Sequence, residues 1–113
     1  SGHPDHIAAG ENTLAAIFPT ARDHMTFPEL VDEGFEPHKV AEAWIMGHPE
    51  PDLWIDISDH METSVRALTS HVTQMSGQSF KEVFDRTIEW RGERGKGHGM
   101  PQADVFKRIY YRR

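Results

Sequence analysis

Two short runs of β-branched and aromatic residues constrain the fold of this chain more than any other feature. Residues 40–46 and 53–57 are such runs, and the segment between them, from Gly47 to Asp52, is rich in turn formers. Each run therefore predicts a strand, and residues 105–111 predict a third. Strands so few in number need helices to cover them, which favours a layered α/β fold.

Helical patterns precede the first strand. Residues 4–21 predict a helix that begins with Pro4 and Asp5 and ends near Pro19 or in the four residues after it. Its expected apolar stripe is Ile7, Leu14, Ile17, Phe18 and Ala21. Residues 28–33 predict a short helix closed by Gly34 within a structured loop.

Two further helices are expected between the second and third strands. Asp59 and Glu62 stand at capping-box spacing, and an apolar stripe follows at Met61, Val65, Leu68, Val72 and Met75. Ser79 and Glu82 form a second capping box, opening a helix that would bury Phe80, Val83, Phe84 and Ile88 and end before Gly92. The predicted order is helix, strand, strand, helix, helix, strand. These elements leave sheet edges and helix faces uncovered, so we expect a missing part or a homo-oligomer partner.

Composition excludes several classes of protein. The chain has 113 residues, enough for one domain, and a net charge of −6, which disfavours binding to a nucleic-acid backbone. Its basic residues gather late in the chain without the aromatic interleaving of a stacking platform. It contains no cysteine, no apolar run that could span a membrane and no signal-peptide pattern. We therefore expect a cytoplasmic protein with no membrane partner.

The tetrapeptide His3-Pro4-Asp5-His6 carries the clearest potential for chemistry. Its two histidines, three residues apart at a helix start, project from nearly the same side with Asp5 beside them. The positive end of the helix dipole favours neutral imidazole, the form that binds zinc, and would stabilise a developing oxyanion. Three side chains are nevertheless too few for a closed zinc site, and a plain helix start with two exposed histidines is the alternative interpretation.

Other polar and aromatic residues are open to a functional or a structural interpretation. The glycines from Gly92 to Gly99 predict a flexible loop, without phosphate-binding spacing, in which Arg94, Lys96 and His98 are candidates to line a substrate entrance. Trp90 either stacks on a sugar or closes the helix packing. The remaining expectations are that Trp44 and Trp54 pack in the core, that His71 and Gln74 are partly buried packing residues, and that His24, His38 and His60 lie on the surface.

Several motifs, taken in order, resemble the LmbE-like, or PIG-L, zinc-dependent N-deacetylases. They are His3-Pro4-Asp5-His6-Ile7-Ala8-Ala9-Gly10, Phe27-Pro28-Glu29-Leu30, Glu36-Pro37-His38-Lys39-Val40, residues 51–58, Ala67-Leu68 with His71 and Gln74, and residues 103–109. The first is similar to the second signature of that family. The family's first signature, Ala-His-Pro-Asp-Asp, does not occur in these 113 residues, and we interpret the echo of it at Gly47-His48-Pro49-Glu50 as a coincidence.

The resemblance implies a fold, a metal and residue roles. It implies that residues 1–113 are the carboxy-terminal half of one Rossmann-like α/β deacetylase domain, whose amino-terminal half carries the missing signature with two zinc ligands and the general base. It implies zinc bound by His6, an acid or oxyanion-stabilising role for His3, and an orienting role for Asp5. The implied reaction is hydrolysis of an acetamide on an N-acetylated amino sugar, such as an N-acetylglucosamine derivative, or its conjugate, by metal-activated water.

Two hypotheses of other classes stay open. The chain alone lacks part of the implied site, so a non-catalytic α/β module for binding or oligomerisation is the rival to part of a deacetylase. A small metal-binding domain that uses only the histidines present is the third. Apart from the candidates Trp90, Arg94, Lys96 and His98, the sequence predicts no particular substrate-binding residues.

Overall fold

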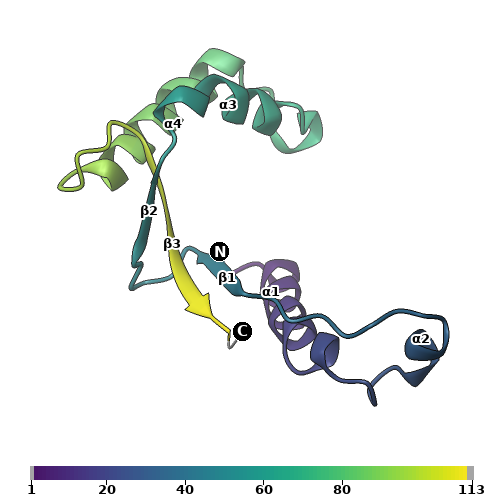
Figure 1. Ribbon diagram of the computed structural model, residues 1–113. Coiled ribbons are helices and arrows are strands. Elements are labelled where there is room, and N and C mark those ends of the chain that lie inside the picture. Colours follow the sequence, from purple (N-terminus) through teal and green to yellow (C-terminus); the bar gives the residue numbers. More distant parts are fainter. Residues whose placement is uncertain (1, 112–113) are drawn as a thin grey trace. The chain divides into compact units, whose positions relative to one another are not determined.

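The computed structural model describes residues 2–111 and divides them into two compact units, residues 2–45 with 108–111 and residues 46–107. The elements are, in order, α1 (Pro4–Ile17), a 3-10 turn (Thr20–Arg22), α2 (Pro28–Asp32), β1 (Glu42–Met46), β2 (Leu53–Asp56), a 3-10 turn (Ser58–His60), α3 (Met61–Thr69), a 3-10 turn (Val72–Gln74), α4 (Phe80–Gly95) and β3 (Ala103–Tyr110) (Figure 1). The expected mixed α/β class and element order are confirmed. None of the helices described between residues 2 and 111 has the length and apolar character needed to cross a membrane.

In the first unit, α1 begins at Pro4 as expected and ends earlier than the apolar spacing suggests. Phe18 has extended backbone angles, and Pro19 and the turn Thr20–Arg22 follow in place of a last helical turn. Proline disfavours helical geometry in the residue before it, which explains why the helix stops at Ile17. The apolar side chains of the expected stripe stay at least partly exposed to solvent, since no residue of α1 is buried.

The short helix α2 confirms the predicted glycine cap. Gly34 has a φ of +97°, and its N–H donates to the carbonyl of Val31 at 3.0 Å. The N–H of Phe35 donates to the carbonyl of Leu30, also at 3.0 Å. This pair of bonds is a Schellman motif, which needs a left-handed residue that glycine adopts without strain.

The three strands form one sheet in the order β1-β3-β2, so the last strand of the chain lies between the first two. In the second unit β2 pairs with β3 antiparallel, with Leu53 opposite Phe106 and Asp56 opposite Ala103 (Figure 1). Lys107 on β3 reaches Asp52 just before β2, with 3.2 Å between Nζ and Oδ2. In the first unit the N–H of Tyr111 donates to the carbonyl of Ala41 beside β1.

The helix α3 differs from its prediction at both ends. The capping box of Asp59 and Glu62 is wrong, because residues 58–60 form a 3-10 turn and the helix begins at Met61 without a side-chain cap. The Asp56 carboxylate accepts from both the N–H and the hydroxyl of Ser58, which favours this turn and lowers the pKa of Asp56. The helix ends at Thr69 and not near Met75.

The helix α4 confirms Ser79 as its N-cap but runs beyond the expected end. The Ser79 hydroxyl accepts from the Glu82 N–H at 3.2 Å and lies 3.1 Å from the Glu82 carboxylate. The prediction that the helix ends before Gly92 is wrong, because α4 continues to Gly95. Gly95 serves a close approach, because a Cβ on it would lie 1.9 Å from the Met100 carbonyl oxygen.

The core of the second unit lies between α3 and α4 at the start of β3. Met61, Val65, Val83 and Ala103 are its buried apolar residues, and Thr87 is buried with its hydroxyl donating to the Val83 carbonyl. The predicted stripes are thus confirmed as buried at Met61 and Val65 of α3 and at Val83 of α4. Leu68, Val72, Phe80 and Ile88 are exposed.

Candidate functional site

The candidate catalytic residues gather at the amino terminus of α1. The His3 and His6 ring centroids are 5.1 Å apart, with 32° between the ring planes. The backbone explains the pairing, because the N–H groups of His6 and Ile7 both donate to the His3 carbonyl and close the first turn. As expected from their spacing, the two imidazoles lie close enough to act on one small group, and both side chains are exposed.

His3 is also the N-cap of α1. Its Nδ1 accepts from the N–H of Asp5 at 3.1 Å. Pro4 has no N–H, so the Asp5 N–H is the first donor of the helix that needs a partner. An accepting Nδ1 carries no proton, so the proton of neutral His3 is on Nε2.

These residues fit part of a zinc site. Imidazole is a ligand that zinc prefers, and the exposed His6 ring at the helix start is accessible to an ion. Within residues 2–111 there is no cluster of three or more histidine, aspartate or glutamate side chains that could hold a metal. Further ligands would therefore have to come from outside the described residues.

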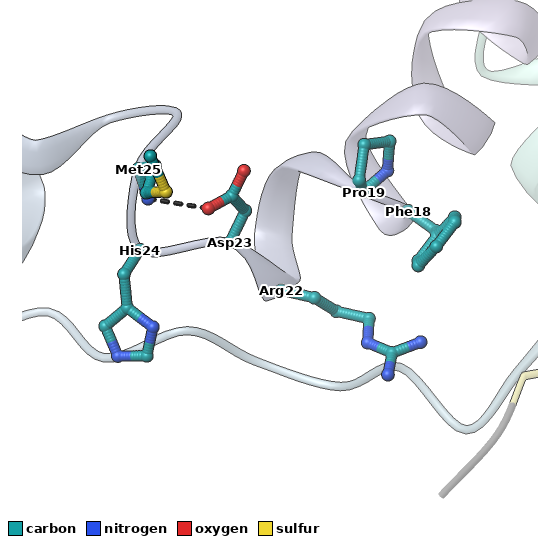
Figure 2. A pocket seen from close by; sticks show the side chains of 6 residues that line it. All are labelled: Phe18, Pro19, Arg22, Asp23, His24 and Met25. Carbon is teal, nitrogen blue, oxygen red and sulfur yellow. Dashed lines mark hydrogen bonds between the residues drawn. The ribbon is translucent and has the colours of Figure 1, made fainter.

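A surface cavity of about 440 Å³ lies at the opposite end of α1, and no sequence pattern had indicated it. It is lined by Phe18, Pro19, Arg22, Asp23, His24 and Met25 (Figure 2). The Arg22 guanidinium lies 5.1 Å from the Phe18 ring centroid. Hydrogen bonds from the Met25 N–H and the Thr26 hydroxyl lower the pKa of Asp23. A helix of 14 residues is about 21 Å long, so this cavity is separate from His3 and His6.

The expected glycine-rich loop is partly helical, and its candidate residues have partners. His98 stacks on Trp54 with ring centroids 3.9 Å apart, and the Trp54 indole N–H donates to the Arg94 carbonyl at 3.1 Å. The Arg94 guanidinium lies 3.8 Å from the Trp90 ring centroid, and Lys96 pairs with Glu93 at 2.7 Å. The stacking of His98 and the ion pair of Lys96 thus hold residues 96–100 against β2 and the end of α4.

Asp104 at the start of β3 joins this cluster, a role that the sequence did not indicate. Its Oδ1 lies 3.0 Å from Arg91 Nε and 3.8 Å from Arg94 Nη1. Arg91 also donates to the Ser64 hydroxyl at 2.8 Å. Such a long-range ion pair has no signature in local spacing, because the partners are on different elements.

Of the remaining sequence-based assignments, some are confirmed and others are wrong. The surface placement of His24, His38 and His60 is confirmed. The packing role of His71 and Gln74 is wrong, because α3 ends before them and both are exposed. Trp44 is 44% exposed, so core packing is wrong for it, whereas Trp54 is half-buried. His48 is half-buried in its loop, where its Nδ1 accepts from the Glu50 N–H at 3.0 Å.

Comparison with known proteins supplies the context for this site. No family model matches the chain. The chain is 29% identical, over 107 residues, to diacetylchitobiose deacetylase from Thermococcus kodakarensis. The aligned region covers 93% of this chain and 40% of that protein, so the chain spans less than half the length of the relative. This similarity to a deacetylase confirms the resemblance to the LmbE-like, or PIG-L, family that the ordered motifs indicate.

Proposed function

We propose that this chain is part of a zinc-dependent hydrolase that removes an acetyl group from an N-acetylated amino sugar or its conjugate. The observation that carries the proposal is the pair of imidazoles at the start of α1, 5.1 Å apart, in a chain similar over 93% of its length to a deacetylase of diacetylchitobiose. We further propose that residues 1–113 belong to one Rossmann-like domain. The remainder would supply the Ala-His-Pro-Asp-Asp signature and more strands.

His3 has a role that follows from its tautomer. With Nδ1 accepting from the Asp5 N–H, the Nε2–H of neutral His3 is the hydrogen-bond donor of the ring. Such a donor can stabilise the negative charge that develops on an amide oxygen under attack, aided by the positive end of α1. Asp5 orients His3 through its backbone N–H, since this bond fixes the rotation of the ring.

His6 is the proposed zinc ligand of this chain. Its ring lies beside that of His3, so a substrate carbonyl positioned at His6 would also reach the His3 donor. Zinc, when bound, would supply Lewis-acid activation of water and of the amide carbonyl. The other ligands and the general base belong to the segment that the chain does not contain.

The test is acetate release from diacetylchitobiose by the complete protein, together with its zinc content. We expect His6→Ala to lose both zinc and turnover. We expect His3→Ala to keep its zinc but to lower kcat by about 10²–10³, the usual loss for one oxyanion donor. His60→Ala is the matched control, because His60 is also exposed but lies in another turn, and it should change neither quantity.

Two results would contradict the proposal. Undiminished acetate release after chelator treatment would exclude the zinc mechanism. A normal zinc content in His6→Ala would remove that residue from the ligand set. A small metal-binding domain built from the chain's own histidines finds no support here, because residues 2–111 bring no three such ligands together.

A further inference from the structure

Trp90 is an exposed aromatic residue whose position is fixed on one side. It is 52% exposed, and the guanidinium of Arg94, one turn later on α4, covers one face of its ring at 3.8 Å. An indole ring is planar, so an exposure this large with one face covered leaves the opposite face open to solvent. A large flat apolar surface is therefore held in a fixed orientation.

Arg94, the backing side chain, is itself held in place. Its Nη1 lies 3.8 Å from the Asp104 carboxylate on β3, and its carbonyl accepts from the Trp54 indole N–H at 3.1 Å. Residues of β2 and β3 thus both contact Arg94, the residue behind Trp90. Little side-chain freedom remains to be lost when a ligand stacks on the ring, which favours affinity.

The surroundings of Trp90 are charged rather than apolar. Its neighbours on the helix surface, three or four residues away, include Arg86, Glu93 and Arg94, and Glu89 precedes it. Arg86, Glu89 and Glu93 are all exposed. The core of a protein interface is depleted of charged residues, so this site does not have the composition of a protein docking surface.

We propose that the open face of Trp90, with its rim of charged side chains, binds a pyranose ring of an oligosaccharide of N-acetylated amino sugars. The axial C–H groups of such a ring form an apolar face that fits the negative face of an indole. Its equatorial hydroxyl and acetamido groups point outward, where guanidinium donors and carboxylate acceptors can meet them. The sugar class rests on the proposed function, whereas the site itself is built from residues of the second unit and His3 and His6 belong to the first.

The experiment uses the complete protein carrying His6→Ala, so that the probe is not consumed. The probe is the tetramer of N-acetylglucosamine, titrated while the tryptophan indole N–H signals, including those of Trp44, Trp54 and Trp90, are followed by NMR. We expect the Trp90 signal to move in a saturable way. Trp90→Ala should bind the tetramer at this site about tenfold more weakly, in keeping with the loss of one aromatic stacking contact.

Two variants make the result specific. Trp90→Phe keeps a flat ring and should bind within about threefold of the parent protein. Ile88→Ala removes another exposed apolar side chain of α4, 38% exposed, and should leave binding unchanged. Unchanged urea midpoints would show that the variants are folded.

The proposal is overturned if the Trp90 signal does not move at saturating tetramer, or if Trp90→Ala binds as the parent does. The Trp90 indole signal would also stay unchanged if another part of the protein covered the Trp90 ring. Failure of the proposed function is a different outcome, namely no acetate release by the protein with His6 intact. Either result can occur without the other.

Discussion

Replacement of Gly95 by alanine should destabilise the second unit, although alanine is the better helix former. A Cβ at this position would lie 1.9 Å from the Met100 carbonyl oxygen and 2.9 Å from the Met100 carbonyl carbon. Both are backbone atoms, so no side-chain rotation relieves the contact, and the chain after α4 would have to shift by about 1 Å. Overpacking of this kind costs about 1–3 kcal/mol, against a propensity gain of about 1 kcal/mol. We therefore expect a net loss of about 1 kcal/mol, and of about 2 kcal/mol at most.

Gly92→Ala is the matched control, because Gly92 is in the same helix one turn earlier. Its Cβ would lie 3.5 Å from Gln102 Nε2 and 3.6 Å from the Pro101 carbonyl oxygen, which are ordinary contacts. This variant should keep the propensity gain, up to about 1 kcal/mol. Urea unfolding of the complete protein gives both free energies by linear extrapolation. Equal stability of the two variants would refute the close approach at Gly95.

Two further predictions concern hydrogen bonds to side chains. Ser79→Ala should lower the free energy of unfolding by about 1 kcal/mol, because the Glu82 N–H loses its cap, whereas Ser70→Ala, after α3, should cost less. Asp23 has a lowered pKa because the Met25 N–H and the Thr26 hydroxyl donate to it, so its contribution to stability is present above its unfolded pKa and is lost as the pH falls through the lower folded pKa. The stability difference between the parent and Asp23→Asn should therefore shrink below about pH 4, and a difference that is constant from pH 6 to pH 3 would contradict this account.

Local chemistry made parts of the fold predictable. The Gly34 cap, the Ser79 N-cap and the start of α1 at Pro4 each depend on contacts within six residues, so spacing alone indicates them. The same holds for the approach of His3 to His6, which one helical turn determines.

The errors arise where other contacts, from distant segments or from near neighbours, override the local pattern. Gly92 looked like a helix end, but α4 continues to Gly95, where the absence of a Cβ leaves room for the returning chain at Met100. Asp59 had the spacing of a cap, yet the Asp56 carboxylate bonds to Ser58 and favours a 3-10 turn there. The link from Asp104 to Arg91 and Arg94 depends on tertiary packing alone.

The place of β3 between β1 and β2 has a consequence for how the chain is made. During synthesis β1 and β2 emerge first, and neither has its partner strand until residues 103–110 have left the ribosome. The α3 and α4 pair, made earlier and joined by a short connection, can pack before that moment. A premature stop just before Ala103 would therefore leave two unpaired strands exposed to association with other nascent chains.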